Sequence, residues 1–281
     1  MLPNKDKISF AIKNTNWCNL KCAHCSECSG PGVVPNIMPL DKVEQYVGEF
    51  CAMPLPKWEY VVFTGGETMA PYFHDQMEYI PRCLDIAAQH KMAPFVKTNG
   101  VWGANTELRS RVLHDFAAAA YRNNLLMSLD VSVDAFHNNA NAVVNIVSDV
   151  VRSDYLAPAV RISLCGLNDM KSQVAFANVI DALRAQGLTV EVRKNGMFVV
   201  GVPHVRGVRV YYDVWTNIGN VGRAVENNLG KFVPDGQPDM ETGHCLQIDN
   251  NDIAKLNYKF SVPVNGRPVY DVARELLVKT R

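Results

Sequence analysis

Segments rich in β-branched and aromatic residues alternate with segments of helical periodicity over about the first 195 residues, and this order limits the folds available to the chain. The predicted strands are Ile8–Lys13, Tyr60–Thr64, Pro94–Thr98, Leu126–Val133, Val160–Leu164 and Thr189–Arg193. The predicted helices between them are Leu40–Ala52, His74–His90, Thr106–Arg122, Ala140–Val151 and Lys171–Gln186. Such alternation predicts an α/β fold in which βα units build a parallel sheet, either open or closed into a barrel.

The pattern becomes irregular beyond Asn195, where glycines are frequent, and a hairpin-like stretch follows near Leu246–Val264. We therefore expect a core domain over residues 1–225 and a short C-terminal extension over residues 226–281. In a parallel α/β fold, functional loops follow the carboxyl ends of the strands, so chemistry is sought at the residues just after each strand.

Composition excludes several classes of function. Lys+Arg and Asp+Glu balance at 28 each, so no global field draws the protein to nucleic acid or to an anionic membrane. The longest apolar runs are shorter than the ~20 residues that cross a bilayer, and the polar N-terminus does not resemble a signal peptide. We expect a cytoplasmic protein that binds neither nucleic acid nor membranes.

Four of the eight cysteines lie close together, between Cys18 and Cys28, directly after the first predicted strand. Cys18, Cys22 and Cys25 have the spacing C-x3-C-x2-C, and three thiolates can hold three irons of a cubane cluster while the fourth iron stays open. A structural zinc site and a redox dithiol made by Cys22 and Cys25 are the alternatives. A zinc site on Cys22 and Cys25, or on Cys25 and Cys28, would need a second Cys/His pair, and none with suitable spacing follows in the sequence. A dithiol leaves Cys18 unexplained.

The remaining cysteines are expected to be structural. Cys51, Cys83, Cys165 and Cys245 are scattered singly, and lone cysteines are most often small buried hydrophobes. Cys28 is expected to be buried for the same reason, and its role is left open together with that of Cys245.

The spacing and position of the cysteine triplet resemble the hallmark of the radical S-adenosylmethionine superfamily. The resemblance implies a partial (β/α)6 barrel, a [4Fe–4S] cluster held by Cys18, Cys22 and Cys25, and S-adenosylmethionine as cofactor. It also places His24, which precedes the last cysteine, near the adenine. An exposed loop histidine is an equally good interpretation of His24.

Three further motifs follow the next strands in the order found in that superfamily. Gly65, Gly66 and Glu67 resemble its Gly-Gly-Glu, which binds the amino group of the methionine moiety. Asn99 lies in a Thr-Asn-Gly after the third strand, and Ser132 with Asp134 resembles the Ser-x-Asp that contacts ribose and the methionine carboxylate. Each motif alone is also a common turn, and Ser128 with Asp130 offers an alternative register on the fourth strand.

The resemblance implies that S-adenosylmethionine is cleaved reductively to a 5′-deoxyadenosyl radical, which takes hydrogen from a small-molecule or peptide substrate. An electron donor such as flavodoxin or ferredoxin would supply the electron. An activating enzyme that makes a glycyl radical on a partner protein is the main alternative, and a dithiol oxidoreductase is a weaker one. The C-terminal extension resembles a reduced auxiliary domain without a cluster, because Cys245 is its one cysteine.

Overall fold

The computed structural model describes residues 7–25, 27–167, 169–192, 197–201, 208–215, 244–256 and 260–278. The chain divides into two compact units. The first comprises residues 1–21, 29–96 and 236–281, and the second comprises residues 22–28 and 97–235. Each unit combines strands and helices, so each is considered in turn.

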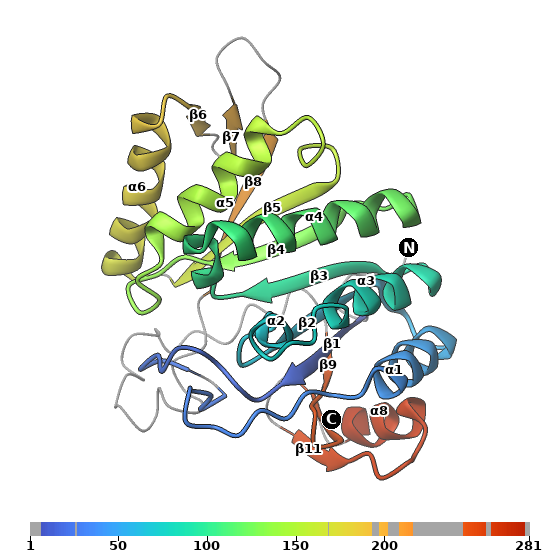
Figure 1. Ribbon diagram of the computed structural model, residues 1–281. Coiled ribbons are helices and arrows are strands. Elements are labelled where there is room, and N and C mark those ends of the chain that lie inside the picture. Colours follow the sequence, from blue (N-terminus) through green and yellow to red (C-terminus); the bar gives the residue numbers. More distant parts are fainter. Residues whose placement is uncertain are drawn as a thin grey trace. The chain divides into compact units, whose positions relative to one another are not determined.

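A mixed, mainly parallel sheet forms the first unit. Its strands, in spatial order, are β11 (Phe260–Pro263), β10 (Ile253–Leu256), β9 (His244–Ile248), β1 (Ile8–Thr15), β2 (Lys57–Gly65) and β3 (Ala93–Thr98). Strand β1 runs parallel to β2 on one side and to β9 on the other, whereas β10 runs antiparallel to both of its neighbours. A strand from the end of the chain therefore lies directly beside the first strand (Figure 1).

Helices α1 (Leu40–Ala52), α3 (Tyr79–Gln89) and α8 (Val269–Val278) pack with this sheet, and the short helix α2 (Ala70–Phe73) follows β2. The apolar residues Val43, Tyr46, Val47 and Phe50 recur at helical spacing, which gives α1 one buried face. Phe50 stacks on Phe10 of β1, with ring centroids 4.5 Å apart. Alternate residues of β1 therefore face this helix layer.

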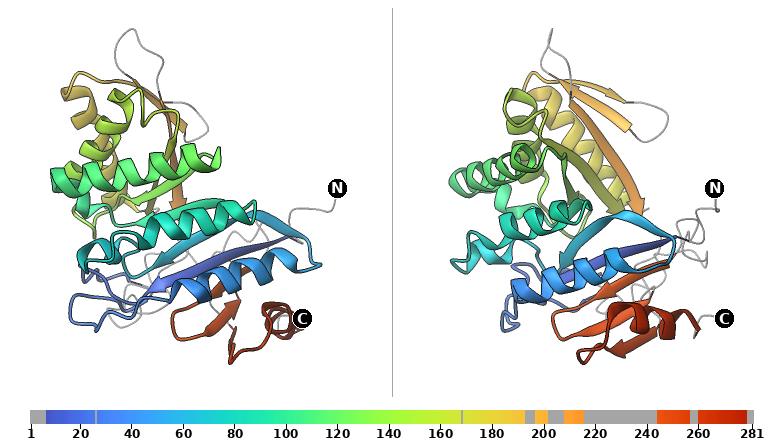
Figure 2. Two further views of the ribbon diagram at one scale, coloured as in Figure 1. Left: turned by 45° about the vertical axis from the view of Figure 1, so that its right-hand side comes forward. Right: turned by 90° about the vertical axis from the view of Figure 1, so that its right-hand side faces the viewer.

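The second unit contains β4 (Met127–Ser132), β5 (Val160–Leu167), β8 (Val208–Trp215), β7 (Met197–Gly201) and β6 (Thr189–Val192), in that spatial order. Strands β4, β5 and β8 are parallel, and β6 and β7 form an antiparallel hairpin that pairs with β8. The helical elements are the 3₁₀ turn Val101–Ala104, α4 (Thr106–Asn123), α5 (Ala140–Arg152) and α6 (Met170–Ala185). Figures 1 and 2 show α4 and α5 lying along the same side of β4 and β5.

The predicted α/β fold is confirmed, since consecutive βα units with mostly parallel strands are those of a partial (β/α) barrel. Two elements differ from the prediction. The strand at Thr189 is antiparallel to its neighbour, and β8 takes the parallel place beside β5. The helix predicted over His74–His90 begins only at Tyr79, because Asp75 has a φ of 57° that interrupts helical backbone.

The described part of residues 226–281 belongs to the first unit through the pairing of β9 with β1. The boundary at residue 225 stays a prediction, because that position lies outside the described ranges. Among the helices that the structure describes, none has the length and apolar character needed to cross a bilayer.

Candidate functional site

The cysteine triplet lies in the loop that follows β1. Cys18 is buried, and the backbone N–H of Leu20 donates a hydrogen bond to its Sγ at 3.4 Å. Cys22 and Cys25 are half-buried and joined by a turn in which the N–H of Cys25 donates to the carbonyl of Cys22 at 3.2 Å. None of the cysteines whose side chains the structure describes forms a disulfide. Three thiols on one short loop fit the requirement of a cluster for three cysteine ligands.

Three of the described cysteines differ from the prediction that they are buried, and one of them, Cys51 of α1, is half-buried. Cys28 is exposed and has a φ of 53°, so it belongs to the tight loop rather than to the core. Cys165 is half-buried, because the alternation of β5 turns it to the same face as Arg161 and Ser163. Residues 219–224 contain a Gly-Arg-Ala sequence that also resembles a motif of the superfamily. These residues and the side chain of Cys245 lie outside the described part of the chain.

Gly65, Gly66 and Glu67 lie against the backbone that follows β1. The N–H of Gly66 donates to the carbonyl of Thr15 at 2.9 Å, and the N–H of Glu67 donates to the carbonyl of Trp17 at 2.7 Å. A Cβ atom on Gly66 would lie 2.1 Å from the carbonyl oxygen of Trp17, so glycine is required for this close approach. The motif thus has a structural reason to hold glycine, whatever it binds.

Glu67 is fully buried, with 0% of its surface exposed. Its Oε1 accepts a hydrogen bond from the N–H of Met69 at 2.9 Å. Asn99 is also buried, and its Oδ1 accepts the N–H of Val101 at 3.0 Å. Both side chains therefore hold turns of their own loops in this structure.

A small pocket of about 80 Å³ in the second unit is lined by part of the predicted site. It is lined by His24, Lys97, Asp130, Ser132, Asp134, His137 and Cys165. Of the predicted residues, His24, Ser132 and Asp134 contribute to this wall. Gly65, Gly66, Glu67 and Asn99 are not among its lining residues.

The other lining residues are Lys97, Asp130, His137 and Cys165, and of these the sequence analysis considered Asp130 alone, in the alternative register. Asp130 and Ser132 are two residues apart on β4, so both point to one face and both line the pocket, whereas Ser128 of the alternative register is not among the lining residues. His137 lies in the same loop as Asp134, between β4 and α5. For Lys97 and Cys165 the sequence carried no signal beyond strand alternation.

Asp134 lies between two imidazoles and is only 5% exposed. Its Oδ2 is 2.7 Å from Nδ1 of His137 and 3.8 Å from Nε2 of His24. Its Oδ1 accepts the backbone N–H groups of Phe136 at 2.8 Å and His137 at 3.2 Å. The ring of Phe136 packs on that of His24, with centroids 4.5 Å apart. Contacts to both of its oxygens therefore hold the carboxylate in one orientation.

The two histidines have opposite pKa shifts. Burial lowers the pKa of His24 to about 4, and the nearby Asp134 only partly offsets this effect. Burial also disfavours the charged form of His137, but hydrogen bonds with Asp134 and Cys22 outweigh it and raise the pKa. The pKa of Asp134 is lowered, because His137 and His24 outweigh the effect of burial on the carboxyl. The site therefore favours a neutral His24 beside a charged Asp134–His137 pair.

His24, Asp134 and His137 also form a group whose ligand-type atoms all lie within 4.8 Å of one another, which is close enough to hold a metal ion. Two histidines and one carboxylate are a ligand set for divalent transition metals. The short contact between Asp134 and His137 is that of a charge-assisted hydrogen bond. The same atoms thus serve either as a hydrogen-bonded chain or as metal ligands.

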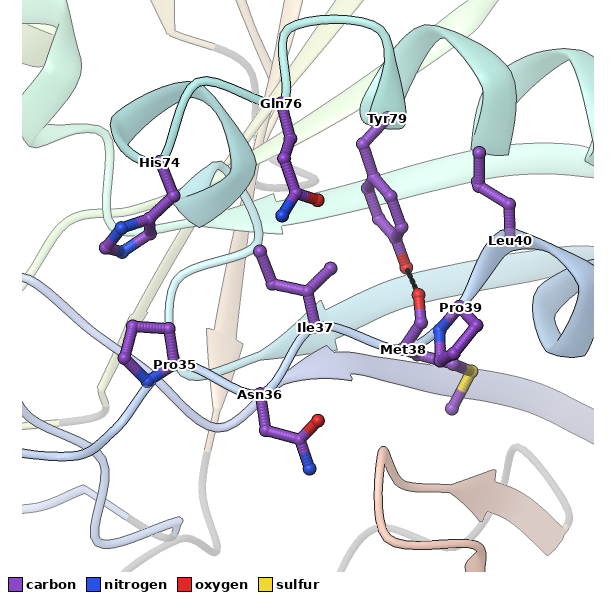
Figure 3. Close-up of a pocket in the computed structure, with 9 residues that line it drawn as sticks. All are labelled: Pro35, Asn36, Ile37, Met38, Pro39, Leu40, His74, Gln76 and Tyr79. Carbon is purple, nitrogen blue, oxygen red and sulfur yellow. Dashed lines mark hydrogen bonds between the residues drawn. The ribbon is translucent and has the colours of Figure 1, made fainter.

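A larger and more open pocket of about 660 Å³ lies in the first unit. Residues 35–40 form one wall, and His74, Gln76 and Tyr79 form the other (Figure 3). The hydroxyl of Tyr79 donates to the carbonyl of Met38 at 2.7 Å and ties the two walls together. None of the predicted site residues lines this pocket.

Comparison with known proteins gives structural relatives alone, since no protein-family model and no curated protein matches the chain. The structure of SuiB from Streptococcus suis bound to S-adenosylmethionine is 10% identical, with a TM-score of 0.47 over 96% of this chain and 66% of that one. Methylornithine synthase (PylB) is 13% identical, with a TM-score of 0.46 over 99% and 83%. Native anSMEcpe with bound S-adenosylmethionine is 16% identical, with a TM-score of 0.41 over 64% and 49%. The chain thus spans just under two thirds of SuiB and about half of anSMEcpe.

Proposed function

We propose that this protein is a radical S-adenosylmethionine enzyme. The observation that carries the proposal is the C-x3-C-x2-C triplet in the loop after β1 of a mainly parallel α/β fold, with its thiols outside any disulfide. A polar pocket that contains His24, from within the triplet, and Ser132 and Asp134, from the end of β4, supports it. Loops after parallel strands are where such folds carry their chemistry.

Cys18, Cys22 and Cys25 would hold a [4Fe–4S] cluster. Such a cluster would supply the low-potential electron for reductive cleavage of S-adenosylmethionine, and the radical so generated would take hydrogen from the substrate. The task of the protein is to bind and orient both molecules and to exclude water. The N–H of Leu20 donates to the sulfur of Cys18 and would keep this hydrogen bond if the sulfur ligated iron.

The cofactor residues in this proposal are His24, Gly65, Gly66, Glu67, Asn99, Ser132 and Asp134. Glu67 would bind the ammonium of the methionine moiety through a charge-assisted hydrogen bond, and Ser132 and Asp134 would face the ribose and the methionine carboxylate. Pockets for ligands of this size are roughly 300–1,000 Å³. The pocket of about 80 Å³ would therefore take only a part of the cofactor.

The substrate in this proposal is a small molecule or a peptide, and the reductant is a flavodoxin or ferredoxin. Residues 1–225 would form the catalytic core, and residues 226–281 an extension without a second cluster. A cytoplasmic location suits the proposal, because reduced thiols persist there and are needed to ligate iron.

The test begins with anaerobic reconstitution of the full chain. We expect about four irons and four sulfides per chain with a broad charge-transfer absorption, as for one cysteine-ligated cubane. Cys18→Ala, Cys22→Ala and Cys25→Ala should each lose the cluster, whereas the exposed Cys28→Ala should retain it. A preparation that binds zinc and no iron would refute the proposal, and loss of iron in Cys28→Ala would show that the ligand set is wrong.

Cofactor binding and chemistry form the second part of the test. Glu67→Gln should keep the cluster but weaken S-adenosylmethionine binding by roughly 1.5–3 kcal/mol, because a charge-assisted hydrogen bond is lost. Glu78→Gln, at an exposed carboxylate, should bind S-adenosylmethionine as the wild type does.

The cleavage reaction is tested separately. Reduced wild-type protein should release 5′-deoxyadenosine. A rate that rises only with a large partner protein would favour the glycyl-radical activating alternative, and a reconstituted protein that binds the cofactor without ever cleaving it would contradict the proposed reaction.

A further inference from the structure

His137 lies in the middle of a chain of contacts that runs from Asp134 to a cysteine of the triplet. Its Nδ1 is 2.7 Å from Oδ2 of Asp134, and its side chain also hydrogen-bonds that of Cys22. Since Nδ1 faces the carboxylate, Nε2 is the ring nitrogen left for the sulfur. Asp134 is itself fixed by two backbone N–H groups, so the ring of His137 is held in one orientation.

The chemistry of an iron-bound cysteine decides which way this hydrogen bond runs. A thiolate that ligates iron carries no proton, so a contact between Cys22 and His137 persists only if Nε2 donates its N–H to the sulfur. Asp134 favours this arrangement, because a carboxylate at Nδ1 holds a proton there and makes the whole imidazole a better donor. The side chain of His137 is 13% exposed and that of Asp134 is 4% exposed, so water competes little for either contact.

We propose that His137, oriented by Asp134, donates a hydrogen bond to the sulfur of Cys22 and thereby raises the reduction potential of the cluster. The proposal rests on the proposed function and assigns Asp134 a positioning role. An added electron increases the negative charge on the cluster sulfurs, and a donor beside one of them stabilises the reduced form more than the oxidised form. Hydrogen bonds to the sulfurs are one of the means by which proteins set the potential of such clusters.

The neighbouring His24 has a different position in this arrangement. Its Nε2 is 3.8 Å from Asp134, beyond hydrogen-bond distance, and its ring packs on Phe136. The relay from carboxylate to imidazole to sulfur therefore runs through His137 alone. A metal ion shared by His24, Asp134 and His137 would be the competing use of these atoms, and the two uses give different experimental results.

The test is the reduction potential of the reconstituted cluster, titrated without S-adenosylmethionine and followed by electron paramagnetic resonance. His137→Leu removes the donor and should shift the potential to a more negative value while iron and sulfide content stay at the wild-type level. His137→Gln restores a neutral N–H donor, so its reduction potential should lie between those of the wild type and of His137→Leu. His114→Leu, which changes an exposed histidine of α4, should leave the potential unchanged.

A measurement on the wild-type protein guards against failure of the variants to fold. With ¹⁵N-labelled histidine, pulsed electron paramagnetic resonance of the reduced cluster should show a weak ¹⁵N coupling, which unlabelled protein replaces by a ¹⁴N coupling and which any loaded His137 variant lacks. An unchanged or more positive potential in His137→Leu, or no nitrogen coupling in wild type, would overturn the inference. So would a divalent ion bound by the wild type and lost in both His24→Gln and His137→Gln. Wild-type protein that never forms a four-iron cluster would instead refute the proposed function itself.

Discussion

Two carboxylates of this chain, Glu67 and Asp134, carry the same sequence-based expectation, namely contact with the cofactor, and the structure gives each a set of protein partners. Glu67 is fully buried and accepts a hydrogen bond from the N–H of Met69. Asp134 accepts two backbone N–H groups and faces two imidazoles. A carboxylate with such partners is held in a fixed orientation before any ligand arrives, which reduces the ordering cost of binding.

At the level of single residues, the sequence predicted which residues belong to the candidate site better than it predicted the residues that surround them. The triplet and the Ser-x-Asp motif follow from local spacing, and His24, Ser132 and Asp134 do line one pocket. Lys97 of β3 and Cys165 of β5 line the same pocket. Their presence there depends on the alignment of these strands with β4, and such register is not encoded in any local stretch of sequence. The burial of Cys28 was predicted wrongly, since its positive φ belongs to a loop that composition does not reveal.

Gly66→Ala is expected to destabilise the protein, because its Cβ would meet the carbonyl oxygen of Trp17 at 2.1 Å and backbone atoms cannot move aside easily. Overpacking of this kind costs about 1–3 kcal/mol and sometimes more. Urea unfolding monitored by circular dichroism measures the change. Gly32→Ala is the matched control, since a Cβ there meets nothing within 4 Å and the free energy of unfolding should change by no more than about 0.5 kcal/mol. Equal stability of the two variants would show that the loop after β2 does not lie against Trp17.

At the level of helices and strands, sequence periodicity was most reliable where flanking residues mark the ends of an element. Helix α1 was predicted at its observed bounds, Leu40–Ala52, because Pro39 directly precedes it and Pro54 follows shortly after. The helix at Tyr79 was predicted too long because no residue type announces the positive φ of Asp75. The pairing of β9 with β1 could not be predicted, since no local signal connects strands so distant along the chain.

Gln247→Leu on β9 is expected to stabilise the protein. Gln247 is 2% exposed, and neither atom of its amide has a hydrogen-bond partner within the part of the chain that the structure describes. An unsatisfied buried polar group costs about 1–3 kcal/mol, and leucine of similar size avoids that cost. Chemical denaturation of the protein without ligands measures the gain.

The control for this change is Gln45→Leu, because the amide of Gln45 is exposed and donates to Glu49 at 2.8 Å. That variant should gain no stability. If Gln247→Leu were less stable than wild type, the amide of Gln247 would have to be satisfied in solution by a group other than those seen here.

Asp169→Ala is expected to weaken the start of α6. The Oδ1 of Asp169 accepts the N–H groups of Lys171 at 2.9 Å and Ser172 at 3.0 Å, so it caps the first turn. Loss of such a cap costs about 1 kcal/mol. Thermal unfolding should show the decrease, whereas Asp181→Ala, which removes an exposed carboxylate from the same helix, should unfold close to wild type. Equal effects of both changes would mean that charge, not capping, stabilises this helix.

For the whole molecule, the proposed cofactor provides a test that does not depend on catalysis. A ligand that binds only the folded protein stabilises it, by about 2.7 kcal/mol at a free concentration 100 times its dissociation constant. S-adenosylmethionine should therefore raise the unfolding temperature of the cluster-loaded protein. The Cys22→Ala protein, which lacks one proposed ligand, should show a much smaller increase under the same anaerobic conditions. The same shift with and without the cluster would indicate a binding mode that does not involve the iron.

The position of β9 also has a consequence for how the chain folds during its synthesis. Ile8 of the first strand pairs with His244, so the edge of β1 is completed by residues that leave the ribosome about 230 residues later. At roughly 5–20 residues per second this leaves the edge open for on the order of 10–50 s. An unpaired strand edge invites association with other chains during that interval. A nascent chain of this protein is therefore expected to need protection by chaperones until its last strands emerge, and slower translation should lower its soluble yield.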